Sequence, residues 1–91
     1  MTFTDLDTWK ELRALVKIVY NCMERFPKEE VYGLQSQIKR STISIPSNIA
    51  EGCGRSQPKD MMRFYYIARG SVYELETQLY LSLDLNFIEE V

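Results

Sequence analysis

Apolar residues recur every three or four positions along three segments of the chain. In the first segment they are Trp9, Leu12, Val16, Val19, Met23 and Phe26. This spacing places them on one side of an α-helix. Thr8 and Glu11 have the spacing of a capping box, and Pro27 disfavours a helical conformation in the residue before it. The pattern therefore predicts a helix over about residues 8–26.

The second segment shows the same period through Leu34, Ile38, Ile45 and Ile49. Two glycines close to its end, at positions 52 and 54, are typical of a helix that stops in a left-handed residue. A proline inside a helix removes one backbone hydrogen bond and bends the axis. We therefore predict one helix over residues 34–52, kinked at Pro46.

The third segment begins at Pro58, which suits the first position of a helix. The apolar residues Met61, Tyr65, Ala68, Val72, Leu75 and Leu79 follow at helical spacing. We predict a helix over residues 58–85. Gly70 costs stability within it but leaves a smooth patch that another backbone could approach closely.

Residues 86–91 have the pattern of one further helical turn. Asn86 is a favourable N-cap, and Glu89 stands three positions later, where a capping box has a carboxylate. The sequence thus predicts one all-α domain over residues 1–91. Its architecture would be an up-and-down helical bundle of the four-helix type, with three complete helices and only the start of the fourth.

Length and composition limit the classes of protein to which the chain can belong. It has 91 residues, of which 45% are hydrophobic and 26% charged. This length suits a single domain, and the apolar content is enough for a core. No apolar run reaches the roughly 20 residues that span a bilayer, and the acidic N-terminus does not resemble a signal peptide. We expect a cytoplasmic protein without a membrane partner.

Candidate chemistry is sparse. The chain has no His and two cysteines, so the common zinc patterns and a disulfide framework are both absent from the sequence. The commonest general base is missing too, and Glu51 has no evident titratable partner. The sequence therefore predicts neither an enzyme nor a cofactor.

Charge is unevenly distributed although the net charge is only −2. Residues 39–69 hold six basic residues against two acidic ones, and residues 71–91 hold five acidic residues and no basic one. Either the middle segment forms a basic surface, or helices of opposite charge attract each other. On the first interpretation, the candidate nucleic-acid contacts are Lys39, Arg40, Arg55, Lys59, Arg63 and Arg69.

A polar stripe accompanies the apolar side of the second helix. Its members are Gln37, Arg40, Ser44, Asn48, Glu51 and Arg55. If the second and third helices are antiparallel, this stripe faces the third helix. We then expect a structural polar network of Gln37, Arg40, Asn48, Glu51 and Glu74. Its central contact would be an ion pair between Arg40 and Glu74, with Glu51 close to Lys59 and Arg63.

The polar stripe and a run of aromatic residues can each also be interpreted as part of a nucleic-acid interface. Arg40, Asn48 and Arg55 could instead donate hydrogen bonds to an RNA or DNA backbone. The consecutive aromatic residues Phe64, Tyr65 and Tyr66 belong either to a core or oligomer contact, or to a surface on which bases stack.

Several motifs occur together along the chain. They are YGL at residues 32–34, QxxR at 37–40, SIPSNIAEG at 44–52, IARGS at 67–71 and ELE at 74–76. In this order they resemble the four-helix bundle proteins encoded in intervening sequences of bacterial large-subunit rRNA genes. The resemblance extends from Trp9 to about Phe87.

The resemblance implies an up-and-down four-helix bundle that assembles as a ring-shaped homopentamer. A related branch, the accessory variability proteins of diversity-generating retroelements, has a similar fold and binds a reverse transcriptase and nucleic acid. That branch is markedly basic, whereas this chain is mildly acidic. Family members also carry a complete fourth helix. Here another subunit would cover the face containing Leu79, Leu81, Leu83 and Leu85, or the sequence is a fragment or comes from a truncated gene.

Two functional hypotheses follow. The first is a non-catalytic oligomeric bundle that serves as a nucleic-acid or ribonucleoprotein accessory factor. The alternative is a protein-interaction scaffold, for example for a reverse transcriptase, with no direct nucleic-acid binding. The partners expected are further copies of the chain, RNA or DNA, and a protein.

Overall fold

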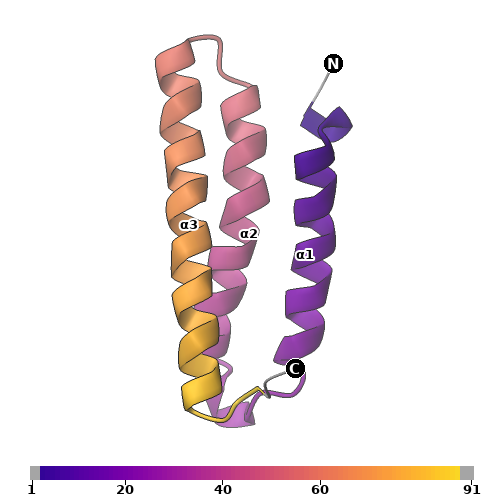
Figure 1. The fold of residues 1–91 in the computed structure, drawn as a ribbon, viewed down its shortest axis with the longest axis vertical. Helices are drawn as coiled ribbons and strands as arrows, with labels where there is room; N and C mark the ends of the chain where they lie inside the picture. Colours follow the sequence, from indigo (N-terminus) through magenta and orange to yellow (C-terminus); the bar gives the residue numbers. More distant parts are fainter. Residues whose placement is uncertain (1–2, 89–91) are drawn as a thin grey trace.

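A computed structural model describes residues 3–88, and within them the chain forms three long α-helices and no strand (Figure 1). A 3₁₀ turn, η1 (Phe3–Asp5), precedes α1 (Asp7–Met23), and a second, η2 (Lys28–Glu30), leads to α2 (Leu34–Cys53). The last helix is α3 (Pro58–Asp84). Consecutive helices run in opposite directions. The all-α prediction is confirmed, whereas the fourth helix of the predicted bundle is not.

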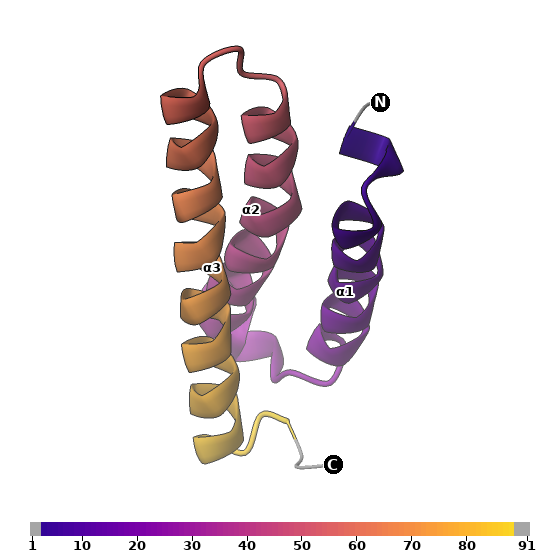
Figure 2. The same cartoon turned by 45° about the horizontal axis from the view of Figure 1, so that its top comes forward.

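Helix α2 is the centre of the arrangement. It packs against both α1 and α3, and among residues 3–88 no Cα atom of α1 lies within 8 Å of one of α3. Figure 2 shows α1 and α3 on separate sides of α2. No helix in this described part is both long and apolar enough to cross a bilayer.

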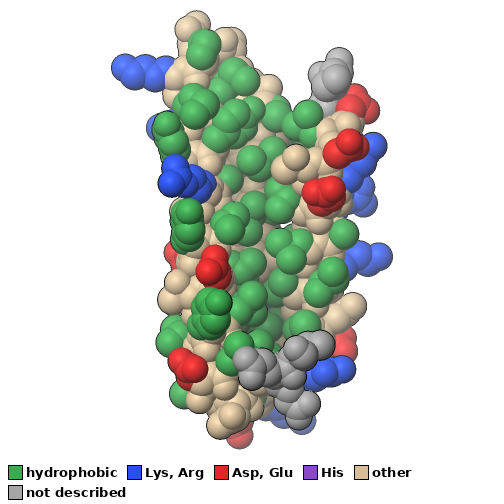
Figure 3. Space-filling view, viewed as in Figure 1, with side chains coloured by type: hydrophobic (Ala, Val, Ile, Leu, Met, Phe, Trp, Pro, Cys, Tyr) green, Lys and Arg blue, Asp and Glu red, His purple; other side chains and the backbone are tan. Residues whose placement is uncertain are grey.

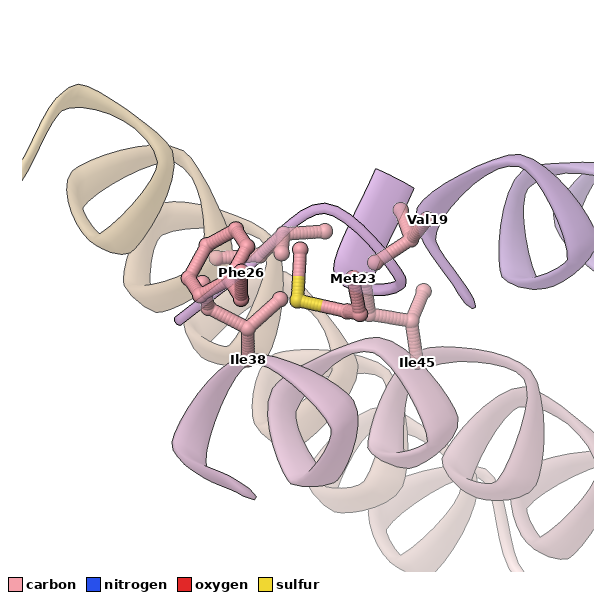
Figure 4. Close-up of a cluster of buried hydrophobic side chains, with 6 residues drawn as sticks. Val19, Met23, Phe26, Ile38 and Ile45 are labelled. Atoms are coloured by element: carbon pink, nitrogen blue, oxygen red, sulfur yellow. The ribbon is translucent and has the colours of Figure 1, made fainter. Parts of the chain in front are cut away.

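The hydrophobic core lies where α1 turns into α2. Val19, Met23 and Phe26 contact Ile38 and Ile45 there (Figure 4). Leu75 completes this cluster from α3. Met23 and Ile38 are almost fully inaccessible to solvent. The 3.6-residue period identified all six of these side chains because only one face of each helix can reach the centre.

Helix α1 is shorter than the sequence predicts at its C-terminal end. The amides of Glu24, Arg25 and Phe26 donate to the carbonyl three residues earlier, at 3.1–3.3 Å. The last turn therefore tightens into 3₁₀ geometry, as is common at helix ends. Phe26 is buried although it lies beyond α1. At the other end, Leu6 occupies the N-cap position without a side-chain hydrogen bond, so the predicted capping box at Thr8 is wrong.

Helix α2 continues through Pro46 and ends at Cys53. Its end does not use a left-handed glycine, because Gly54 has φ −84° and no glycine in residues 3–88 has a positive φ. Gly52 serves another purpose. A Cβ atom at this position would lie 2.6 Å from Cε1 of Tyr65 and 3.2 Å from the Met61 carbonyl oxygen. The missing side chain thus lets α3 approach α2 closely.

Asn86 ends α3 and does not cap a fourth helix. Its φ of 61° is left-handed, whereas an N-cap residue is normally extended. The Phe87 amide donates to the Ser82 carbonyl at 2.9 Å, and the Asn86 amide donates to the Leu83 carbonyl at 3.0 Å. This pair of hydrogen bonds is a Schellman motif. Residues 87 and 88 are not helical, and the predicted capping partner Glu89 lies outside the described residues.

The reversal at Asn86 directs the chain back onto the core. The rings of Phe87 and Phe26 pack with their centroids 5.6 Å apart, and Ile88 also contacts the core cluster. Further along the molecule, the side of α2 between α1 and α3 remains uncovered. Figure 3 shows hydrophobic side chains over this face. A hollow of about 390 Å³ there is lined by Leu12, Ile45, Ile49, Tyr65, Ala68 and Val72, among others.

The leucines near the end of α3 do not share one environment. Leu81 and Leu85 are about half exposed, whereas Leu79 and Leu83 are partly buried. Leu79 packs against the core cluster. The apolar face that was expected to need a partner is therefore divided between two sides of α3.

Candidate nucleic-acid interface

Polar side chains hold α2 against α3. The buried hydroxyl of Ser41 lies 2.6 Å from Oε1 of Glu74 and 2.9 Å from Oε1 of Gln78. One turn further, the Ser71 hydroxyl donates to the Ser44 hydroxyl at 2.8 Å. These contacts join α2 to α3 at two levels and fix how the helices align.

The Ser41 hydroxyl has three oxygen neighbours, because its own helix supplies the Gln37 carbonyl at 3.0 Å. A hydroxyl has one proton, so it cannot donate fully to all three. A carboxylate is the strongest acceptor among them, and the shortest distance is the one to Glu74. We therefore assign the proton to the Ser41–Glu74 bond. No buried side-chain nitrogen or oxygen within residues 3–88 lacks a partner.

The ion pair predicted between Arg40 and Glu74 is wrong. Arg40 is exposed, and its side chain makes no hydrogen bond or ion pair with the described residues. Ser41 occupies the position opposite Glu74 instead. One residue along a helix rotates the side chain by about 100°, so this small error in alignment points Arg40 away from α3.

Two other members of the predicted network bond to residues four positions away along the chain rather than to α3. The Asn48 amide donates to the Ser44 carbonyl at 2.7 Å, one turn earlier. Glu51 forms an ion pair with Arg55 at 3.1 Å rather than with Lys59 or Arg63. The contacts between helices come instead from short hydroxyl side chains, which the charge pattern of the sequence does not reveal.

The connection from α2 to α3 is closed by Tyr65. Its ring covers Gly52, and its hydroxyl lies 3.6 Å from Sγ of Cys53. This hydrogen bond, together with partial burial and the electrostatic effect of Cys53, raises the pKa of Tyr65 above its ordinary value. The phenol therefore stays neutral at physiological pH and can maintain the bond.

Two arginines flank one aromatic ring just beyond this point. The guanidinium carbon of Arg55 lies 4.7 Å from the centroid of Phe64, and that of Arg63 lies 4.9 Å from the same centroid. Attraction to the ring holds both cations close together at one end of the molecule. Glu51 balances Arg55, while Arg63 and the exposed Lys59 have no ion-pair partner among the described residues.

The six predicted contact residues do not form one patch. Only Arg55, Lys59 and Arg63 gather, at or near the α2–α3 turn, and we call these three the tip cluster. The others are distributed along the molecule. Lys39 stacks on Tyr20 of α1 at 4.9 Å, and Arg69 lies 5.9 Å from the ring centroid of Tyr73.

The three consecutive aromatic residues also separate. Phe64 is flanked by the two guanidinium groups, and Tyr65 packs on Gly52. Tyr66 is 60% exposed. Of these three rings, Tyr66 is therefore the one with a face free to stack on a base.

A second group of cations was missed by the sequence reasoning. A hollow of about 800 Å³ between α1 and α2 is lined by Lys10, Arg13 and Lys17, and Arg13 stacks on Trp9 at 5.3 Å. The spacing of these cations along α1 places them on one side of the helix. This spacing is visible in the sequence. Charge counts over a long segment do not reveal it, because acidic residues nearby cancel the positive charge.

Other reactive groups are dispersed. Cys22 is exposed and Cys53 partly buried, and both are free thiols. In the described part of the chain, no three residues among His, Cys, Asp and Glu come together as metal ligands would.

Comparison with known proteins places this arrangement in a family. The model of the 23S rRNA-intervening sequence protein family matches residues 4–91. A search of curated proteins gives no match.

Proposed function

This chain belongs to the 23S rRNA-intervening sequence protein family, and on that premise we propose that it is a non-catalytic bundle acting as a nucleic-acid or ribonucleoprotein accessory factor. We propose further that it works as a homo-oligomer, the pentamer that the sequence resemblance implies. The ligand would be the sugar–phosphate backbone of RNA or DNA.

The tip cluster is the observation that carries this proposal. Guanidinium groups bind phosphate through paired hydrogen bonds, and a group already held on a ring loses less freedom on binding. Arg55 and Arg63 are both held on Phe64, and Lys59 adds a third cation nearby. Such contacts recognise phosphate rather than base sequence, so we expect binding with little sequence preference.

The test is binding to a structured RNA across a salt series. For two or three phosphate contacts, log K should fall with log salt at a slope of roughly −1.5 to −3. Reversing both charges, as Arg55→Glu with Arg63→Glu, should weaken binding at least about tenfold because two attractions become repulsions. A matched control is Arg25→Glu with Lys28→Glu, which changes the charge equally in exposed residues of the α1–α2 connection.

Two outcomes would contradict this function. One is the absence of binding at low ionic strength. The other is an equal loss of affinity in the tip and control variants, which would mean that total charge matters and the tip does not. The homo-oligomer is tested separately by light scattering at micromolar concentration. A mass of one 10.7 kDa chain would contradict it.

A second candidate function is a scaffold for a protein such as a reverse transcriptase, without direct nucleic-acid binding. The net charge of −2 favours it, because net negative charge repels nucleic acid at long range. Capture of such a partner that persists in the Arg55→Glu, Arg63→Glu variant, with no RNA binding by the natural protein, would support this alternative.

A further inference from the structure

The hollow between α1 and α2 has both an apolar lining and a cationic rim. Its apolar part includes Trp9, Ile43 and Pro46, and its rim carries the three cations Lys10, Arg13 and Lys17. Among residues 3–88, no carboxylate and no residue of α3 lines it. Ile43 is 44% exposed. A surface of this composition fits a partner that combines large apolar groups with negative charge.

The C-terminal half of α3 presents that combination. Tyr73, Glu76, Tyr80 and Asp84 follow one another at three or four positions, which places them on one side of the helix. The two tyrosines are about 60% exposed. Neither Glu76 nor Asp84 forms an ion pair with the described residues, and no basic residue follows Arg69 in the sequence.

We propose that the α1–α2 hollow of one copy of the chain receives this face of α3 from a second copy. The inference rests on the proposed homo-oligomer and identifies the contact that builds it. Tyr73 and Tyr80 would pack on the apolar lining. Glu76 would pair with Arg13, and Asp84 would meet a lysine of the rim.

The dimensions of the two surfaces agree. At 1.5 Å per residue, Lys10 and Lys17 are separated by about 10 Å along α1, and Glu76 and Asp84 by about 12 Å along α3. Arg13 lies between the two lysines and is held on Trp9, so its cation occupies a fixed place on the rim. Opposite charges at matching intervals give an interface its orientation, and the apolar groups supply most of its area.

The contact joins two different surfaces, one on α1 and α2 and the other on α3. Each copy can therefore accept a neighbour on one side and offer α3 to another on the other side. Such head-to-tail contacts produce a closed ring when the rotation between copies allows it, and a filament otherwise. The contact is therefore of the kind that a ring-shaped pentamer requires.

A charge exchange tests the contact. Arg13→Glu and Glu76→Arg should each raise the dissociation constant of the assembly at least tenfold, because each places like charges opposite one another. The double variant restores opposite charges and should return to within about threefold of the natural protein. Lys28→Glu, which changes an exposed cation outside the hollow, should assemble as the natural protein does. Light scattering over a concentration series gives the masses, and circular dichroism verifies that each variant is helical.

Every outcome decides between the ideas. If the natural protein is a monomer, both the proposed homo-oligomer and this contact fail. If it assembles and the single variants assemble equally well, only the contact is wrong. Single variants that dissociate without recovery in the double variant also overturn the pairing.

Two further results complete the test. Loss of RNA binding by Arg13→Glu with an unchanged mass would mean that the hollow binds nucleic acid, and the contact would again be wrong. If a reversal prevents folding, Arg13→Gln and Glu76→Gln remove the charge alone. Each should then weaken assembly about threefold, and unchanged assembly would reject the contact.

Discussion

Apart from the apolar contacts of Leu75 and Leu79, helix α2 meets α3 through small and polar side chains, whereas it meets α1 mainly through large apolar ones. On the α3 side, Ser41 and Ser44 form hydrogen bonds and Gly52 leaves space for a tyrosine. On the α1 side, Val19 and Met23 pack into a cluster at one end of the helix pair. The same helix thus uses two kinds of interface.

The two interfaces differ in how narrowly they define the alignment of the neighbouring helix on α2. Hydrogen bonds and close backbone approach require particular distances, so they define one alignment of α3 on α2. Burial of apolar groups is strong but non-directional, so it holds α1 firmly while specifying its alignment less narrowly. We expect the α1 side to contribute more free energy of unfolding and the α3 side to be more sensitive to small changes in shape.

The largest effect is expected in the apolar cluster. Met23→Ala removes a side chain that is only 2% exposed and leaves a cavity, so it should lower the free energy of unfolding by about 2–5 kcal/mol. Ile18→Ala, at a position 59% exposed on the same helix, should change it by less than about 1 kcal/mol. Urea denaturation at one fixed protein concentration measures both. Equal losses in the two variants would mean that this cluster is not the main source of stability.

Glycine-to-alanine changes test the close approach of α2 and α3. Gly52→Ala forces a Cβ atom against Tyr65 and the Met61 carbonyl, so we expect a loss of about 1–3 kcal/mol. Gly70→Ala has no neighbouring atom within 4 Å and should stabilise the helix by about 0.5–1 kcal/mol. The opposite signs are the decisive result in thermal denaturation. Stabilisation by both changes would show that α3 can move away from Gly52 at no cost.

A smaller loss than that of Gly52→Ala is expected when one hydroxyl is removed. Ser41→Ala removes the hydroxyl that donates to Glu74 and that also lies beside Gln78. The free energy of unfolding should fall by about 1–2 kcal/mol. Ser47→Ala, an exposed change on the same helix, should lie within about 0.5 kcal/mol of the natural protein. Urea denaturation compares the two. If the variants are equally stable, the hydrogen bonds of this interface add specificity without net stability.

Periodic features of the molecule could be predicted from sequence. Each helix was found because its buried residues recur at the helical period, and all six residues of the core cluster lie on those stripes. End effects were less accessible. Asn86 illustrates why, since asparagine favours both an N-cap and the left-handed residue after a helix. In the structure Asn86 is left-handed, and the next residue, Phe87, packs on Phe26. The residue type at position 86 alone does not distinguish the two conformations.

Contacts between helices were predicted less well than the helices themselves. Ser41 rather than Arg40 faces Glu74. Which residues of α2 and α3 face each other depends on the conformation of the turn between them, and the sequence pattern does not determine that conformation. The tip cluster shows the same limitation. Arg55 lies in the α2–α3 turn and Phe64 lies in α3, so their stacking depends on how that turn folds.

The reversal at Asn86 has a consequence for the order in which the chain folds. It brings Phe87 onto Phe26, a contact between residues far apart in sequence, whereas α2 and α3 are connected by only a short turn. Closing the long loop costs more chain entropy than closing the short one. The α2–α3 hairpin should therefore form early, and the Phe26–Phe87 contact should form after the rate-limiting step. Phe87 would then influence how fast the protein unfolds rather than how fast it folds.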